Sequence, residues 1–407
     1  MDTIYERRLR NTSRAICARP DWIEAIRDAD ARADWAAKAK AEKVTDLEFR
    51  YVLAELEFYA SLHSPKSNIR LSAADGVWLS DSLIAAETAK ELREHAAVLE
   101  NVPDSQKDWH PKARSRVLNL IDPSLYPLIY TLSWLHRQPI ASPRAALTLE
   151  TLGEQPGNLD EWRRALGGTG DNRPKYHLSV VDEKKALYAS GKFSWLPSEF
   201  CVDNSGGVTI ESYSNNLHPV RHAALYSTIA SVFAKFLPLL EQVLTDLVHP
   251  RKPGVELDLD RTVRTSQELG GIDIKNGLCV VLPNTYQCKL PRVMREIGSK
   301  PSHCKMLTFY YVDPSKHIPS TEIVLPQQGD WWKEQVRESE LLCNLLLLVV
   351  DGIMDKIDYP ISLKNAKQIC LEMEAEVKEK TANVSSKFFV PLYSIKLVDT
   401  PTSLRQD

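Results

Sequence analysis

The sequence has no excess of charge of either sign and no stretch that concentrates basic residues. Its 51 lysines and arginines are matched by 54 aspartates and glutamates, which gives a formal net charge of −3. Proteins that bind a phosphate backbone usually carry a basic stripe, whereas this chain shows Lys and Arg only in short pairs. We therefore expect no nucleic-acid partner.

Long hydrophobic runs and a secretory leader are also lacking. The first eleven residues are charged and contain no apolar core, which argues against a signal peptide. The most apolar run, residues 345–350, is far too short to span a bilayer and predicts a buried helix instead. The seven cysteines contain no C-x-x-C pair, as expected for free thiols in a reducing compartment. We therefore expect a cytoplasmic protein without a membrane span.

Several familiar catalytic patterns are missing. None of the ten histidines is followed two residues later by Asp or Glu, so the usual first half of a non-haem iron site is absent. No G-x-S-x-G sequence marks a hydrolase nucleophile, and the glycines at 167–170 match neither a dinucleotide fingerprint nor a P-loop. Zinc binding by Cys279, Cys288, His303 and Cys304 fits no known spacing, so free thiols are the favoured interpretation.

What is present predicts an α+β protein. Thr45 and Glu48 form a capping box that opens a helix ending near Leu62. Apolar periodicity predicts further helices over 85–99, 219–247, 331–357 and 362–380, the second of them kinked at Pro238. Short β-type segments are expected at 195–200, 208–213, 278–282 and 306–312. We expect a mainly helical region over 1–190, followed by a long helix, a β core and C-terminal helices over 191–407.

The segment from Asn215 to His218 carries two carboxamides and an imidazole just before the predicted helix 219–247. Side chains of this kind commonly cap the first N–H groups of a helix. They could equally present hydrogen-bond donors and an acceptor to a ligand. The pattern favours capping and leaves ligand contact open.

Several longer motifs resemble one known family. They are D-W-H-P at 108–111, D-P-S-L-Y-P-L at 122–128, W-L-P-S-E-F at 195–200, S-Y-S-N-N-L-H-P at 212–219, V-D-P at 312–314, P-Q-Q at 326–328 and I-S-L-K-N-A-K at 361–367. Together they resemble a mostly fungal domain-of-unknown-function family, DUF4246, over nearly the whole chain. The resemblance implies a double-stranded β-helix core of the iron/2-oxoglutarate oxygenase kind.

The chain departs from the family pattern where the oxygenase chemistry would lie. The family's W-H-x-E segment, which supplies the first His and the carboxylate, is missing after the long helix. The family's F-P-N-x-x-Q-H is replaced by L-P-N-T-Y-Q-C, which puts Cys288 at the place of the distal His. The family's H-R-K is replaced by H-C-K, so Cys304 stands where an Arg would bind the cosubstrate carboxylate. Both the metal ligands and the carboxylate clamp are therefore expected to be lost.

The missing segment implies a remodelled, truncated jelly-roll core, packed against the helical N-terminal part and the C-terminal helices. Open strand edges invite pairing, so we also expect a homodimer. Period-two alternation places Tyr286 and Cys288 on the face that would have held the metal. By the same rule Cys304, Met306, Thr308 and Tyr310 share a neutral, apolar face. A repacked core is the alternative for each of these residues.

An emptied cavity of this kind predicts a metal-independent cyclase of fungal secondary metabolism, such as a Diels–Alderase, acting without a cofactor on an apolar polyene or terpenoid. The predicted catalytic residues, which would stabilise negative charge on a carbonyl, are Tyr286, Lys305, His218 and Tyr310. The predicted substrate-binding residues are Trp195, Glu199, Tyr213, Asn215, Asn216, Cys288, Cys304, Met306 and Thr308. No metal ligand is expected. Two alternatives stay open: a non-catalytic pseudo-oxygenase that binds or scaffolds, and an oxygenase with an atypical iron site.

Overall fold

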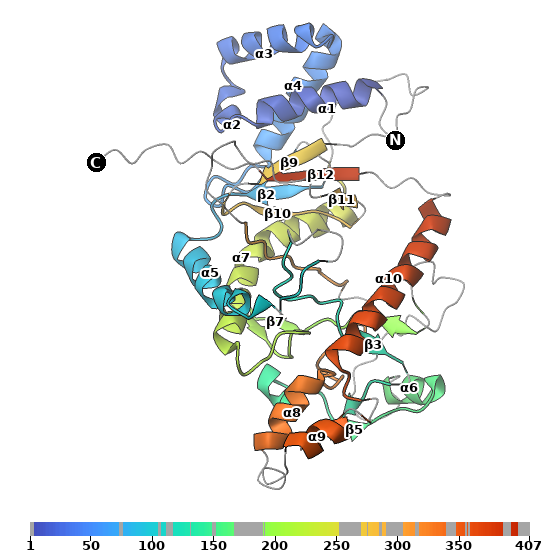
Figure 1. Ribbon diagram of the computed structural model, residues 1–407. Helices are drawn as coiled ribbons and strands as arrows, with labels where there is room; N and C mark the ends of the chain where they lie inside the picture. Colours follow the sequence, from blue (N-terminus) through green and yellow to red (C-terminus); the bar gives the residue numbers. More distant parts are fainter. Residues whose placement is uncertain are drawn as a thin grey trace. The chain divides into compact units, whose positions relative to one another are not determined.

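A computed structural model shows helices interspersed with short strands (Figure 1). The described residues are 4–72, 76–104, 107–110, 117–130, 132–148, 152–166, 190, 192–251, 270–274, 276–284, 287–289, 304–313, 317–338, 347–354, 356, 359–385 and 392–397. The α-helices are α1 (Ile4–Cys17), α2 (Trp22–Ala25), α3 (Ala29–Ala41), α4 (Asp46–Ser61), α5 (Ala86–Glu100), α6 (Leu159–Leu166), α7 (Ala223–Val248), α8 (Gly329–Glu338), α9 (Leu347–Met354) and α10 (Leu363–Ser385).

The strands are short and pair in twos and threes. They are β1 (Arg70–Leu71), β2 (Trp78–Ser80), β3 (Leu128–Ile129), β4 (Leu135–His136), β5 (Leu152–Glu154), β6 (Phe193–Ser194), β7 (Phe200–Val202), β8 (Val208–Ile210), β9 (Gly270–Ile274), β10 (Cys279–Val281), β11 (Gln287–Lys289) and β12 (Leu392–Leu397). The two three-stranded sheets have the orders β1-β2-β10, which is antiparallel, and β11-β12-β9, which is parallel. The two-stranded sheets are β3-β6, β4-β5 and β7-β8.

The α+β class is confirmed by this arrangement. The described strands nevertheless form small separate sheets, and they show neither a jelly roll nor a double-stranded β-helix. The predicted strand pair around residues 195–213 is present as β7 and β8, although its first strand begins only at Phe200. Residues 306–312 were expected to form a strand, but in the described part of the chain they belong to no sheet.

The chain divides into two compact units, each built from separate stretches of sequence. Unit 1 comprises Met1–Ala89, Lys235–Cys304 and Phe388–Asp407, and unit 2 comprises Lys90–Ala234 and Lys305–Lys387. Each unit therefore takes residues from both sides of position 190, so the expected boundary there does not separate them. One boundary lies inside α7, between Ala234 and Lys235.

In unit 1, α1, α3 and α4 bury their apolar side chains against one another. Trp35 of α3 and Val52 and Leu56 of α4 belong to this core. The predicted capping box is confirmed, because the Glu48 amide donates to Thr45 Oγ1 at 3.3 Å while the Thr45 amide donates to Glu48 Oε2 at 2.7 Å. These bonds satisfy two N–H groups that a helix otherwise leaves without partners at its start.

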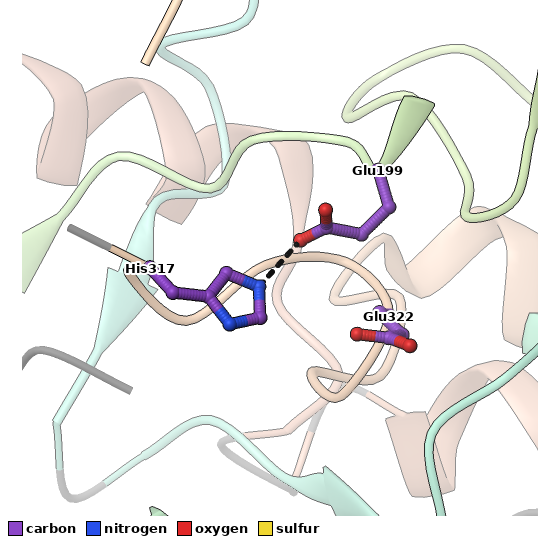
Figure 2. Close-up of side chains that lie close together, drawn as sticks. All are labelled: Glu199, His317 and Glu322. Atoms are coloured by element: carbon purple, nitrogen blue, oxygen red, sulfur yellow. Dashed lines mark hydrogen bonds and ion pairs between the residues drawn. The ribbon is translucent and has the colours of Figure 1, made fainter. Parts of the chain in front are cut away.

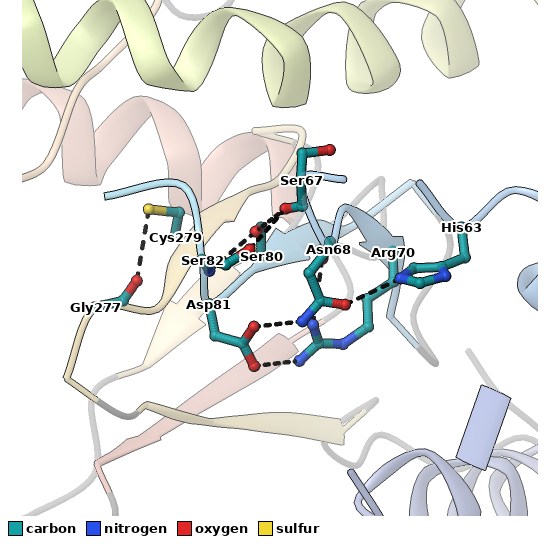
Figure 3. A network of polar contacts seen from close by, with 9 residues as sticks. All are labelled: His63, Ser67, Asn68, Arg70, Ser80, Asp81, Ser82, Gly277 and Cys279. Carbon is teal, nitrogen blue, oxygen red and sulfur yellow. Dashed lines mark hydrogen bonds and ion pairs between the residues drawn. The ribbon is translucent and has the colours of Figure 1, made fainter. Parts of the chain in front are cut away.

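A polar network joins the turn after α4 to the β1-β2-β10 sheet (Figure 3). Asn68 has a left-handed φ of 45°, and its side chain links His63 Nε2, at 3.0 Å, to Asp81. Arg70 Nη2 donates to Asp81 Oδ2 at 3.1 Å. Burial disfavours the charge on Asp81, but the Arg70 guanidinium and the Asn68 amide outweigh that effect and lower the pKa of this carboxyl.

The core of unit 2 is rich in aromatic side chains. Tyr130 and Trp162 meet edge to face with ring centroids 5.6 Å apart, and Tyr213 and Trp331 do so at 6.0 Å. A second apolar cluster includes Leu225 and other residues from the first turns of α7. Aromatic edge-to-face pairs add modest stability beyond the area that they bury. The segments that carry the predicted site residues 195–218 and 305–310 pack against these clusters.

The helix α7 is 26 residues long and runs through Pro238 without interruption. By length and composition it is the one helix among the described residues that is long and apolar enough to cross a membrane. A core helix of a water-soluble protein passes the same test, and Leu225, Leu239 and Val243 are buried in the cores of the two units. The prediction for residues 345–350 is wrong in part: α9 is a helix, but Leu348 is 84% exposed.

Candidate functional site

Only part of the predicted site lies within the described residues. Tyr286 falls outside them. Cys288 lies in β11, where its main chain pairs with Tyr393 of β12, but its side chain is outside the described part. The other predicted residues are all described. Most of them lie in a segment around Met306, in or beside a buried polar network around Asn215, or in a half-buried group at Glu199.

The segment 304–310 alternates as predicted, but the predicted face points outward. Cys304, Met306, Thr308 and Tyr310 are exposed, with exposed fractions of 49% for Met306 and 78% for Tyr310. The opposite face, Leu307 and Phe309, packs on the core of unit 2, where the rings of Phe309 and Phe233 lie 5.2 Å apart. The face expected to line a cavity is therefore a surface. Leu307 and Phe309, which have purely hydrocarbon side chains, are partly buried, whereas the other face carries the Thr308 hydroxyl and the Tyr310 phenol.

The ammonium group of Lys305 is held by neighbouring acceptors. Its Nζ lies 2.6 Å from Glu100 Oε1 and donates to the Arg93 carbonyl oxygen at 3.4 Å. Both ion-pair partners are about one quarter exposed. The Lys305 ammonium group therefore stabilises the end of α5. These two partners, Glu100 and Arg93, are not among the other predicted catalytic residues.

His218 caps the turn that leads into α7. Its Nδ1 accepts hydrogen bonds from the amides of Val220 and Arg221, both at 3.2 Å, which assigns the proton of the neutral ring to Nε2. Nε2 lies 3.5 Å from Glu334 Oε2. Burial, followed by the Arg221 charge, lowers the pKa of His218 to about 4, and the opposing effect of Glu334 is smaller. His218 therefore caps the turn that precedes α7 and not the first N–H groups of the helix itself, and its ring is neutral at pH 7.

Asn215 is a buried bridge between two segments that are distant in sequence. Its Nδ2 donates to the carbonyl oxygens of Leu125 and Tyr126, at 2.7 and 3.0 Å. Its Oδ1 accepts from Gln328 Nε2 at 3.0 Å. The side chain thus joins the D-P-S-L-Y-P-L motif to the P-Q-Q motif, and its donors and acceptor are used within the protein.

Gln327 strengthens the same bridge. Its Nε2 donates to the carbonyl oxygens of Tyr126 and Pro127, at 2.8 and 2.7 Å, and its Oε1 accepts from Ser133 Oγ at 2.5 Å. Gln327 is 1% exposed. Three of the motifs that carry the family resemblance therefore meet in one buried polar network, which we call the Asn215 network: Asn215, Gln327, Gln328 and the main chain of residues 125–127.

Two further predicted residues have structural contacts. Tyr213 is fully buried, its hydroxyl donates to the Val324 carbonyl oxygen at 3.1 Å, and burial raises its pKa well above the ordinary value. Asn216 adopts a left-handed φ of 64°, which Asn tolerates better than most residues, so it forms the turn before His218. Trp195 differs from both, since it is 51% exposed.

Among the predicted residues that the structure describes, Glu199 is the one that lies in a group of possible metal ligands. Figure 2 shows its carboxylate beside His317 and Glu322, and the three donor atoms all lie within 4.8 Å of one another. His317 Nε2 and Glu199 Oε1 are 3.3 Å apart, with side chains 37% and 30% exposed. We call these residues the Glu199 cluster. It offers two carboxylates and one imidazole at a half-buried point that solvent can reach.

The main chain holds this cluster firmly. The Glu199 amide donates to Ser212 Oγ at 2.8 Å, and Ser212 Oγ lies 2.7 Å from Thr321 Oγ1. The Thr321 amide donates to the Pro197 carbonyl oxygen at 2.9 Å, which ties the two ligand-bearing loops directly together. Ser320 and Thr321, next to Glu322, are completely buried. Residues 197–199 and 320–322 are therefore one connected piece of structure.

His317 and Glu322 were not predicted from the sequence. They are separated from Glu199 by more than 100 residues, and their own spacing of five matches no ligand motif. The V-D-P and P-Q-Q motifs on either side marked this stretch as part of the family resemblance, but only the fold brings it to Glu199. The W-L-P-S-E-F motif at 195–200, which contains Glu199, was the one signal in the sequence that pointed to the Glu199 cluster.

Comparison with known proteins gives a family and no individual relative. The profile of a family described as a protein of unknown function, DUF4246, matches residues 46–258 and 251–335. No curated protein and no solved structure matches the chain. The matched residues cover well over half of the 407-residue sequence. The chain therefore belongs to the DUF4246 family.

Proposed function

We propose that this protein is a pseudo-oxygenase, which has given up iron-dependent oxidation and binds an apolar small molecule. The sequence supports the loss, because Cys288 and Cys304 stand where the resemblance implies a metal-binding His and a carboxylate-binding Arg. The family match also falls into two parts that overlap at residues 251–258, as expected where a family segment has been removed. The truncated jelly-roll core and a fungal origin belong to the same proposal.

The observation that carries the binding function is the exposed side of residues 304–312, which we call the 304–312 strip. It presents Met306, Thr308 and Tyr310, followed by Tyr311 and Val312, at exposed fractions of 38% to 78% for the four apolar or aromatic members. Contiguous exposed apolar groups commonly mark a binding surface. The strip is also fixed in place, since Leu307 and Phe309 anchor its inner face.

The dimensions of the strip suit an elongated apolar ligand. In an extended chain, alternate side chains are roughly 6.6 Å apart, so Met306, Thr308 and Tyr310 mark a path of about 13 Å. A conjugated polyene can lie along such a path, with its chain against the thioether of Met306 and a carbonyl group near a tyrosine hydroxyl. Binding without turnover needs no enclosure, and an exposed strip provides none.

A metal-independent cyclase is a second form of this proposal. The phenol of Tyr310 is 78% exposed and can donate a hydrogen bond to a carbonyl of a bound ligand. Such a donor would stabilise the negative charge that develops during a Diels–Alder cycloaddition. An open strip restrains a flexible substrate less than a closed cavity does, which is why binding ranks first.

Binding is tested directly with cis-parinaric acid, a conjugated polyene whose fluorescence rises in apolar surroundings. We expect saturable binding to the full chain, weakened at least about tenfold in the double variant Met306→Ser/Tyr310→Ser. Leu348→Ser is the control, because Leu348 is also apolar and exposed, at 84%, but lies on α9. Equal binding by the double variant and the control would overturn the proposed surface, as would no binding by the wild type.

A homodimer completes the proposal. The strip lies outside every described sheet, and a second copy of the chain can add a strand along such a segment. Light scattering coupled to size-exclusion chromatography should give twice the chain mass. A monomer at all concentrations would remove the dimer while leaving ligand binding to be judged by the fluorescence titration.

A further inference from the structure

We propose that Glu199, His317 and Glu322 form a binding site for a first-row divalent metal ion. This inference goes beyond the proposed function and does not depend on it. Among the described residues, the Glu199 cluster is the one group of three possible ligands whose donor atoms all lie within 4.8 Å of one another. Figure 2 shows the imidazole and both carboxylates directed into the same small space.

The separations suit a small cation. An ion bound at about 2.0–2.2 Å from each ligand holds pairs of ligand atoms roughly 3–4.3 Å apart, depending on the geometry. The 3.3 Å separation of His317 Nε2 and Glu199 Oε1 falls inside this window, and the limit of 4.8 Å for the group lies just above it.

The main-chain contacts favour a prepared site over a chance encounter of surface side chains. Glu199 is fixed by Ser212, and Glu322 is fixed through its carbonyl oxygen, which accepts from the Ile140 amide at 3.0 Å. The Thr321–Pro197 hydrogen bond sets the distance between the two loops. Ligands held on rigid, mutually bonded loops lose little conformational freedom when the ion binds.

The ligand chemistry indicates which ions would bind. One imidazole nitrogen with two carboxylates suits Zn²⁺, Mn²⁺ or Fe²⁺, whereas Ca²⁺ and Mg²⁺ prefer oxygen ligands alone and Cu⁺ prefers sulfur. The half-buried position leaves room for water as a further ligand. The two carboxylates also carry the charge that a divalent ion would neutralise, and His317 would bind in its neutral form.

A simpler interpretation is an ion pair between Glu199 and protonated His317, with Glu322 nearby by coincidence. The two interpretations predict different effects of added metal on stability. An ion pair gains nothing from Zn²⁺, whereas a metal site is stabilised by it, because a ligand that binds only the folded state raises the unfolding temperature.

The test is isothermal titration of the reduced, EDTA-treated full chain with Zn²⁺. We expect one equivalent of Zn²⁺ to bind, with affinity lowered at least about tenfold in His317→Ala and in Glu322→Gln. His249→Ala and Glu338→Gln are the controls, because both residues are exposed and lie outside the cluster. The unfolding temperature should rise with Zn²⁺ in the wild type and in both controls, but not in the cluster variants.

Two results would overturn the site: no Zn²⁺ binding by the wild type, or equal binding by the cluster variants and the controls. Cys201 and Cys304 are exposed and could take up Zn²⁺ adventitiously. Substitution with Co²⁺ separates the cases, because thiolate ligation gives an intense near-ultraviolet charge-transfer band that nitrogen and oxygen ligands lack. That band in the wild type would count against the Glu199 cluster. The polyene titration is read independently, so failure of one proposal leaves the other in place.

Discussion

The Asn215 network and the 304–312 strip derive from the same family resemblance, yet the structure uses them in opposite ways. Asn215, Gln327 and Gln328 belong to motifs that carry the resemblance and are buried, with hydrogen bonds to main chain, to Ser133 or to one another. The strip lies where the family motif has changed, and its predicted face is exposed. Retained motif residues thus hold the fold of unit 2 together, and the altered segment supplies accessible surface.

This difference changes how the resemblance should be interpreted. A motif shared with the family does not by itself indicate chemistry, because the same side chains can be needed for folding. His218 illustrates the point, since its imidazole caps a turn instead of facing a ligand. The comparison predicts large stability effects in the network and small ones in the strip.

The largest effect is expected from Asn215→Ala. The substitution removes two hydrogen bonds to the carbonyl oxygens of Leu125 and Tyr126 and leaves Gln328 Nε2 without its acceptor, all in buried positions. We expect the free energy of unfolding to fall by about 3 kcal/mol, as measured by urea denaturation. Met306→Ala in the exposed strip is the control, with an expected change within about 0.5 kcal/mol. Equal effects of the two substitutions would contradict the comparison.

A pH-dependent effect is expected from His218. Burial and Arg221 lower its folded pKa to about 4 from an ordinary value of 6.5, so the unfolded chain binds the extra proton first as the pH falls. Stability from this residue is therefore complete above pH 6.5 and is lost between pH 6.5 and 4. The loss amounts to about 2 kcal/mol between pH 7 and pH 5.

The measurement is urea denaturation of the wild type and of His218→Gln at both pH values. The variant should be less stable at pH 7, because its cap is lost, but it should lose less stability than the wild type on going to pH 5. Parallel losses in the two proteins would show that His218 does not titrate as described.

Lys305→Met should cost about 1 kcal/mol, because it breaks a partly buried ion pair with Glu100. Since the ammonium group is engaged with Glu100, polyene binding by the strip should change less than twofold. The same cis-parinaric acid titration measures this. A tenfold loss of binding with unchanged stability would instead place Lys305 in the binding site. The division between residues that stabilise the fold and residues of the strip that bind ligand would then not hold for Lys305.

The smallest effect is expected in unit 1, from Asp81→Asn. The pKa of Asp81 is lowered mainly by Arg70 and Asn68 against the opposing effect of burial, so its contribution is present above the ordinary pKa and is lost as the pH falls. Because this carboxylate is 39% exposed, the expected loss at pH 7 is below about 1 kcal/mol. Denaturation at pH 7 and pH 3 should show the wild type approaching the variant at the lower pH.

The sequence was most informative where structure depends on neighbouring residues. The capping box at Thr45 and Glu48 was predictable because its donors and acceptors are three residues apart. The alternation of residues 304–310 was predictable too, but not which face would be buried. Which face is buried depends on the residues that pack against the segment, and here Phe309 packs against Phe233 of α7.

The Glu199 cluster shows the limit of sequence reasoning most clearly. Glu199 was singled out through its motif, whereas His317 and Glu322 reach it only because Thr321 bonds to Pro197 and to Ser212. The jelly-roll core implied by the resemblance also failed to appear among the described strands, which form small separate sheets. Long-range pairing of this kind is not encoded in any local pattern.

We propose that the protein keeps the fold of its family but has given up iron-dependent oxidation. The most direct test is a 2-oxoglutarate turnover assay. The reduced protein is supplied with Fe²⁺, 2-oxoglutarate, oxygen and cis-parinaric acid, and succinate is quantified over time. We expect no succinate above the level given by heat-denatured protein, even when the polyene is bound. Steady enzymatic formation of succinate, abolished by EDTA, would contradict it.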